Sequence, residues 1–101
     1  MPVQTFTFEW DEAKAARNRR KHGVSLAMAA SIFHDPHLLT TADLEHSATE
    51  ERWFSLGMAR NGALLAVAYS WTAQEPAIIR IRLISARRAS RAEREQYEER
   101  L

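Results

Sequence analysis

The chain has 101 residues, a net charge of +1 and no cysteine. This length fits one domain spanning residues 1–101. The composition, with 46% hydrophobic and 27% charged residues, excludes a disordered or membrane-embedded chain. Without cysteine, disulfides and thiolate metal sites are excluded as well. No apolar run approaches the roughly 18 residues of a membrane span and no signal-peptide core is present, so we expect a cytoplasmic protein.

Although the net charge is small, the charges are sorted along the chain. Residues 14–21 carry five basic side chains and no acid, and residues 80–94 carry six arginines against one glutamate. Between them, residues 35–51 carry five acids and no lysine or arginine. If the fold brings the two basic blocks together, the local potential suits an anionic ligand far better than the net charge indicates.

The first third of the chain predicts one strand and two helices. Residues 5–10 alternate polar and aromatic side chains, which is typical of a strand. Asp11 is a good N-cap for a helix that should end at Gly23, since glycine can take the left-handed conformation. A second helix, with Ser25 as its cap, should end at Asp35–Pro36.

The rest of the chain predicts a three-strand antiparallel meander and a last helix. Residues 53–59 and 64–71 are typical of strands, and Asn61–Gly62 should join them in a type I′ turn because both residue types accept positive φ. The third strand follows, and Ser90–Glu93 fits the capping box that opens a helix. We therefore expect an α+β fold, in which a small antiparallel β-sheet packs with N-terminal helices and a C-terminal helix.

The segment from residue 78 to residue 90 is rich in arginine. It first alternates apolar and charged side chains, which places isoleucine and leucine on one face of a strand and arginine on the other. The arginines are Arg80, Arg82, Arg87 and Arg88, the last two near the expected end of the strand. This pattern is typical of a phosphate-binding surface, although a solvated strand face followed by an ordinary helix start explains it equally well.

A second basic cluster closes the first helix, whose last turn holds Arg19, Arg20, Lys21 and His22. Cations are stabilised beside the negative end of the helix dipole, and this effect alone can explain such a cluster. Lys21 and His22 are nevertheless candidates for proton transfer, because histidine titrates near neutral pH. No GxGxxG, Walker, HExxH or CxxC motif occurs, and His46–Ser47 is a further candidate pair of a base beside a hydroxyl.

Three stretches of the chain resemble the BrnT family. They are Phe8–Asp11 with Lys14, Asn18 and Lys21–Ser25; His46–Ser47, Glu50–Trp53 and Gly57; and Arg82–Ala89 with Glu93, Arg94 and Tyr97. The resemblance implies the toxin of a type II toxin–antitoxin pair, a small ribonuclease with a RelE-like fold. It also implies RNA as the substrate, a BrnA-like antitoxin as the protein partner, operator DNA bound only through the antitoxin complex, and no membrane.

Cleavage of RNA needs no metal ion if the 2′-OH of the RNA attacks the adjacent phosphate. The enzyme then takes a proton, gives one to the leaving oxygen and stabilises a charged phosphorane, a role that suits the planar guanidinium. We expect phosphate and transition-state binding from Arg80, Arg82 and Arg87, with Arg52 as a fourth catalytic arginine and Arg88 as a further RNA contact. The candidate proton-transfer groups are Lys21 and His22, with Glu51 as a rival base. We expect no metal and no cofactor.

Two other functions fit the same sequence. A non-catalytic module would use the arginine-rich face only to dock a protein or a nucleic acid. A small structural domain would simply keep its charges in solvent. The sequence alone leaves these alternatives open.

Overall fold

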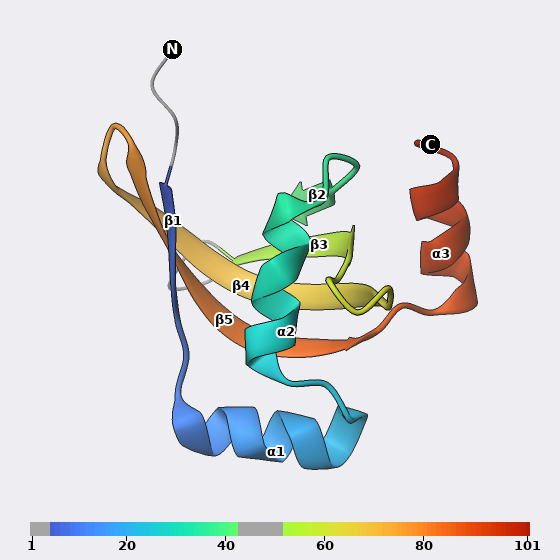
Figure 1. Cartoon of the computed structure of the whole chain (residues 1–101), viewed down its shortest axis with the longest axis horizontal. Helices are drawn as coiled ribbons and strands as arrows, with labels where there is room; N and C mark the ends of the chain where they lie inside the picture. The colour runs from blue at the N-terminus through green and yellow to red at the C-terminus, as the bar shows by residue number, and fades with distance from the viewer. Residues whose placement is uncertain (1–4, 43–51) are drawn as a thin grey trace.

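Five strands form one sheet in the order β1-β5-β4-β3-β2 (Figure 1). The computed structural model describes residues 5–42 and 52–101. The strands are β1 (Thr5–Glu9), β2 (Leu39–Ala42), β3 (Arg52–Met58), β4 (Leu64–Glu75) and β5 (Ile78–Arg88). The helices are α1 (Glu12–His22), α2 (Leu26–Ala30), the 3-10 helix η1 (Ser31–His34) and α3 (Arg91–Glu98).

The expected meander is confirmed, since β3, β4 and β5 pair antiparallel in chain order. β1 adds a parallel strand beside β5, so the sheet is mixed within an α+β fold. No helix in the two described ranges is both long and apolar enough to cross a bilayer. The likeness to RelE that the resemblance implies stays a prediction.

The helix ends form as their sequences predict. The Asp11 side chain accepts a hydrogen bond from the Lys14 amide at 3.0 Å, and Gly23 ends α1 with a φ of 70°. Ser90 and Glu93 close the capping box in both directions at the start of α3. These local bonds satisfy backbone groups that a helix end leaves unpaired.

The hairpin between β3 and β4 differs from the prediction. Gly62 has a φ of 86°, whereas no non-glycine residue in the described ranges has a positive φ, so the type I′ turn is wrong. The Gly62 amide donates to the Ala59 carbonyl at 2.9 Å, and the Ala59 amide donates to the Ala63 carbonyl at 2.8 Å. This is a three-residue loop with a glycine bulge, which needs one left-handed residue instead of two, and Asn61 stays right-handed.

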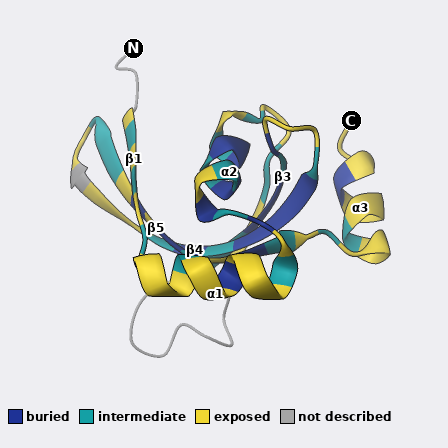
Figure 2. Ribbon diagram, turned by 60° about the horizontal axis from the view of Figure 1, so that its bottom comes forward, coloured by how far each residue is buried: buried dark blue, intermediate teal, exposed yellow. Residues whose placement is uncertain are grey.

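The two faces of the sheet are covered unequally (Figure 2). We call the face that carries Leu65 and Val67 the helix face, because α2 and η1 pack on it over the main core. The opposite face, here the open face, is covered at one end by α3, where Tyr97 joins Leu56 and Leu64 in a smaller cluster. Among the described helices, α3 is the one that packs on this face, through the cluster around Tyr97.

The alternation of β5 is confirmed. Ile81 and Leu83 are buried on the helix face, with 2% and 3% of their surface exposed, whereas Arg80 and Arg82 are exposed. Because a strand turns successive side chains to opposite sides, these arginines project from the open face.

A side-chain amide replaces a missing strand at the outer edge of β5. β1 ends at Glu9, opposite Arg82, so the later residues of β5 have no strand beside them on that side. The buried Asn18 of α1 donates to the Ala86 carbonyl at 2.8 Å and accepts from the Ala86 amide at 3.1 Å. It also donates to the Val24 carbonyl at 2.9 Å.

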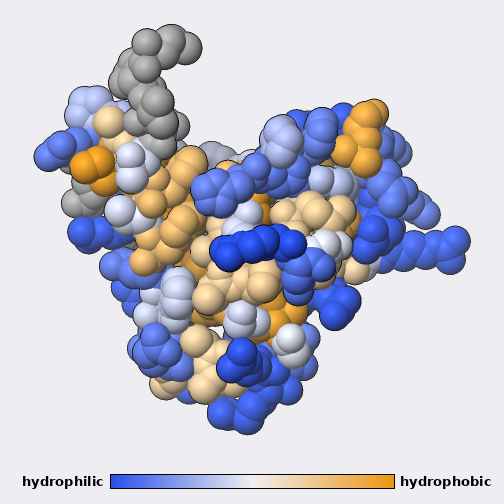
Figure 3. All heavy atoms as spheres, in the orientation of Figure 1, coloured by the Kyte–Doolittle hydropathy of each residue, from blue (hydrophilic) through white to orange (hydrophobic). Residues whose placement is uncertain are grey.

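α1 depends on this amide because the helix offers little else to a core. Asn18 is its only buried residue in the described structure, and hydrophilic side chains line the molecular edge over α1 (Figure 3). Apolar side chains gather instead over α2, at the centre of the same view.

We expect Asn18→Ala to lower the free energy of unfolding by at least about 2 kcal/mol, because the Ala86 and Val24 backbone groups lose their buried partner. Urea denaturation measures this change. Asn61→Ala is the matched control, since the exposed Asn61 side chain accepts one local bond from Ala63 at 3.0 Å and should cost under about 1 kcal/mol. Equal losses in the two variants would contradict the anchoring role of Asn18.

Candidate functional site

One row of polar residues crosses the open face from strand to strand. Arg82 is the cross-strand partner of Ser70, and Ser70 is the partner of Arg52. On its other side Arg82 has Glu9 of β1 as its partner in the register of the two parallel strands. Cross-strand partners share a face and neighbouring strands lie about 4.8 Å apart, so the Arg52 and Arg82 backbones are about 10 Å apart. The sheet thus brings two predicted arginines from separate strands onto one surface.

Arg80 extends this surface by one step along β5. Arg80 and Arg82 line a recess of about 180 Å³ together with Glu9, Ser70 and Thr72. Both arginine side chains are exposed, and Glu9 is the one acid among the residues that line this recess. The recess therefore carries a net positive charge, which suits an anionic group.

A β-bulge places Arg87 on the same face as Arg82. Leu83 pairs with Tyr69 and Ser85 pairs with Ala68, so Ile84 between them has no partner. This extra residue reverses the alternation beyond it, and the odd-numbered Arg87 lies on the open face beside Ala66. The strand also runs through Arg88 and does not end before Arg87.

Glu93 holds the Arg87 guanidinium from α3. The two side chains form a bidentate pair with distances of 2.7 and 3.0 Å, and the guanidinium carbon lies 5.8 Å from the centre of the Phe54 ring. The hydrogen bonds from Arg87 lower the pKa of Glu93 to about 2, against the opposing effect of burial and with help from Ser90. The same pair raises the pKa of Arg87. Arg87 is thus oriented, but much of its charge is already neutralised.

Lys21 and His22 lie in a second recess, between α1 and β5. This recess has a volume of about 320 Å³ and is lined by Lys14, Arg17, Asn18, Lys21, His22, Ile84 and Ser85. None of these lining residues is acidic. Ser85 lies on the open face with Arg82, because its cross-strand partner is Ala68 on that face. The α1 recess therefore opens beside the arginine row, although no arginine of β5 lines it.

Arg88 points the other way from the remaining arginines. Its cross-strand partner is Leu65, a core residue of the helix face that is 1% exposed. Arg88 lines a third recess, of about 140 Å³, with Arg19 and Asn61 among its neighbours. The structure thus gathers Arg52, Arg80, Arg82 and Arg87 on the open face and separates Arg88 from them.

Several residues of this surface were not singled out for it from the sequence. Lys14 and Arg17 join Lys21 because residues three and four apart share one side of a helix, a spacing that was available in the sequence. The ion pair between Glu93 and Arg87 could not be recognised from a comparable pattern in the sequence. The rival base Glu51 and the pair His46–Ser47 lie outside the described residues.

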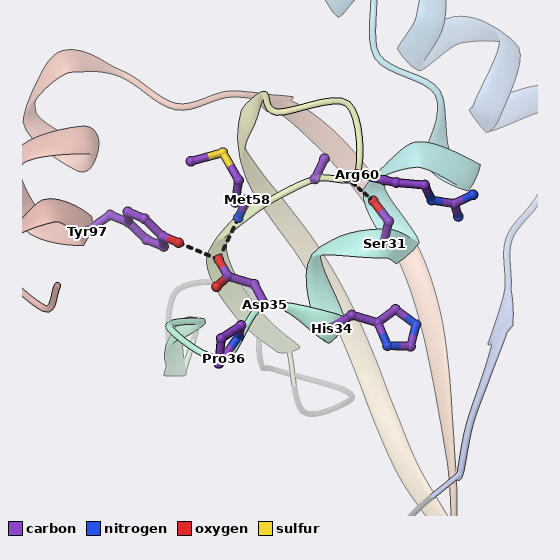
Figure 4. A pocket seen from close by; sticks show the side chains of 8 residues that line it. Ser31, His34, Asp35, Pro36, Met58, Arg60 and Tyr97 are labelled. Carbon is purple, nitrogen blue, oxygen red and sulfur yellow. Dashed lines mark hydrogen bonds between the residues drawn. The ribbon is translucent and has the colours of Figure 1, made fainter.

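A wider cavity of about 550 Å³ lies between Tyr97 of α3 and the chain around η1 and the end of β3 (Figure 4), and none of the predicted site residues lines it. Asp35 accepts hydrogen bonds from the Tyr97 hydroxyl at 2.5 Å and from the Met58 amide at 2.7 Å. Burial acts to raise the pKa of Asp35, but these hydrogen bonds hold it below its ordinary value. Burial and the contact with Asp35 raise the pKa of Tyr97 to about 12. These contacts tie α3 to the chain segment after η1.

The family model described as "Ribonuclease toxin, BrnT, of type II toxin-antitoxin system" matches residues 10–93. The chain belongs to the BrnT family. Every predicted site residue lies within this span. The crystal structure of the Brucella abortus ribonuclease toxin BrnT matches with a TM-score of 0.58 and 22% identity, covering 86% of this chain and 100% of that one. The likeness shows a shared fold. No curated protein matches the chain significantly.

We expect Glu93→Gln to make stability less dependent on acid pH. The pKa of Glu93 falls from 4.5 to about 2 on folding, so its contribution to stability is present above about pH 4.5 and is lost as the pH falls to about 2. The Arg87 side chain is 42% exposed, so solvent screening limits this contribution to about 1 kcal/mol. Urea denaturation between about pH 5 and 2 measures the slope.

The control for this slope is Glu95→Gln, because the Glu95 side chain is 66% exposed and lies 3.7 Å from Arg91. Its stability should follow the wild type across the same pH range. A Glu93→Gln protein with the wild-type slope would show that the Arg87 pair adds nothing to folding.

Proposed function

We propose that this BrnT-family chain is the toxin of a type II toxin–antitoxin pair that cleaves RNA without a metal ion. The observation that carries the proposal is the arginine row beside an acid-free recess that holds a lysine and a histidine. Within the described ranges, no three His, Asp or Glu side chains are grouped as metal ligands would be. The proposed chemistry is proton transfer and charge stabilisation by side chains.

In the proposed reaction the 2′-oxygen of the RNA attacks the adjacent phosphorus, and the bond from phosphorus to the 5′-oxygen breaks. His22 and Lys21 handle the protons: one group accepts the proton of the 2′-OH while the other protonates the leaving 5′-oxygen. An imidazole suits the first task and an ammonium the second. The products are a 2′,3′-cyclic phosphate and a free 5′-OH, so atoms and charges balance.

The arginines stabilise the phosphorane in this scheme. Arg82 and Arg52 approach from the two sides of Ser70 in the row, and Arg80 adds a third guanidinium from the same strand as Arg82. Such donors are effective because they are oriented before charge develops on the phosphorane oxygens. Arg87 contributes a guanidinium that Glu93 holds in place, and its share of the binding is reduced by that pairing.

The same cationic surface suits an acidic partner. We propose that a BrnA-like antitoxin covers it, pairs carboxylates with the arginines, and carries the complex to operator DNA. A surface occupied by the antitoxin cannot bind RNA. Association should slow as salt rises, because attraction between charged surfaces is screened.

We expect the purified protein to cleave RNA in the presence of EDTA and to leave 2′,3′-cyclic phosphate ends, which mass spectrometry of the fragments identifies. Addition of the antitoxin in equal amount should protect the RNA. Activity that EDTA abolishes would exclude the metal-free mechanism. RNA that stays intact, with or without ribosomes, would indicate a non-catalytic binding module.

We expect Arg82→Ala to separate activity from stability. Arg82 is exposed, so the free energy of unfolding should change by no more than about 0.5 kcal/mol. The cleavage rate should fall by roughly 100-fold or more, the scale for losing one preorganised donor. Ile81→Ala, one residue away and buried, should instead destabilise the fold by about 2–5 kcal/mol through the cavity it leaves.

His22→Ala completes this set on the α1 side of the surface. Lost cleavage with an unchanged unfolding midpoint supports proton transfer by His22. Unchanged cleavage would show that His22 is only one of the cations beside the C-terminal end of α1. If Arg82→Ala unfolds the protein or leaves cleavage intact, the open face of β5 is not the active surface.

A further inference from the structure

The third recess, on the helix face, has the composition of an anion site. Arg19 and Arg88 line it from α1 and β5, and Asn61 and Ser25 add a carboxamide and a hydroxyl. None of the lining residues is acidic. Neither guanidinium has a hydrogen bond or ion pair with a described residue, in contrast to Arg87, which Glu93 neutralises.

The third recess and the α1 recess lie on either side of the C-terminal turn of α1. His22 lines the α1 recess, and the next residue, Gly23, lines the third one. Nothing lies within 4 Å of the point where a Cβ of Gly23 would stand, so the surface beside this residue is open to solvent. Asn18 lies beneath this turn and fixes it, since its amide bonds to both Val24 and Ala86. The position of this turn relative to β5 is therefore fixed.

The helix dipole accounts for only one of the two guanidiniums in this recess. Arg19 is in the last turn of α1, where a cation is stabilised by the helix dipole. Arg88 is on a strand, where that effect does not act, yet it faces the same recess. Two guanidiniums in an acid-free recess can hold one phosphate through paired N–H donors.

We propose that Arg19 and Arg88 form a second phosphate subsite, which binds a nucleotide flanking the one that is cleaved beside Lys21 and His22. The proposal rests on the proposed function, because the occupant is a continuation of the same RNA strand. RNA is favoured over an acidic protein segment because consecutive residues, His22 and Gly23, line the α1 recess and the third recess, so that one strand can contact both. The subsite extends recognition from the open face to the helix face.

The test uses oligomers with 2′-O-methyl groups, which the proposed reaction cannot cleave, so that binding is measured without turnover. One oligomer of about three nucleotides is chosen to cover only the arginine row and the α1 recess, and one of about nine, within the usual site sizes for single strands, is chosen to extend to the third recess as well. Arg19→Gln should weaken the longer oligomer about five- to tenfold and leave the shorter one within about twofold. The salt dependence of the longer oligomer should also fall in slope by about 0.7 for the lost phosphate contact.

Arg20→Gln is the matched control, because Arg20 neighbours Arg19 on α1, is exposed and does not line the recess. It should weaken both oligomers equally and by less than about twofold, and Arg88→Gln should reproduce the Arg19→Gln pattern. Unfolding midpoints confirm that all three variants fold.

Two results would overturn the subsite. One is that Arg19→Gln weakens the binding of both oligomers equally, and the other is that it leaves the binding of the longer oligomer unchanged. Weakened antitoxin binding with unchanged RNA binding would overturn it too, and would assign the recess to the protein partner. The length-dependent pattern in a protein that cleaves no RNA would support the subsite while refuting the proposed catalysis, so the two failures are distinguishable.

Discussion

The geometry of the candidate site depends on the carboxamide of Asn18. A β-strand without a neighbour leaves its N–H and C=O groups unpaired, and Asn18 supplies one donor and one acceptor to Ala86 where β1 has ended. Lys21 and His22 follow three and four residues later, so they share the side of α1 that Asn18 turns to β5. One buried amide thus fixes the proposed proton-transfer groups against the open face.

α3 is the second element on which the surface depends, and tertiary contacts hold it at two points. Tyr97 bonds to Asp35 near one end, and Glu93 pairs with Arg87 near the other. The ion pairs within α3, Arg91–Glu95 at 3.7 Å and Arg94–Glu98 at 3.9 Å, are exposed and add little. The position of α3 and the orientation of Arg87 are therefore linked, because Glu93 is a residue of α3 and also the ion-pair partner of Arg87.

Features that depend on local chemistry could be predicted from the sequence. The cap at Asp11, the stop at Gly23, the capping box of α3 and the alternation of β5 each follow from residue type and spacing, and each is confirmed. The hairpin was harder, because an Asn–Gly pair is compatible with two turns and the number of loop residues decides between them. Gly62 alone needed a positive φ.

Features that depend on long-range pairing could not be predicted. The parallel pairing of β1 with β5 joins the two ends of the chain, and no local pattern encodes it. The split between Arg87 and Arg88 required knowledge of the bulge, since the sequence shows only two adjacent arginines near a strand end. The candidate surface was thus predictable as a set of arginines on β5, while its division into two faces and three recesses was not.

The unpaired Ile84 divides β5 into two segments that alternate in opposite phase along the residue numbers. Before it, even-numbered residues face the open side, and after it, odd-numbered residues do. Loss of Ile84 would leave this division unchanged, because Leu83 and Ser85 would then be consecutive residues on opposite faces and Arg87 would stay on the open face. What the extra residue adds is a bend and a stronger local twist, so Ile84 sets the angle at which Ser85 and Arg87 continue the open face beyond Arg82.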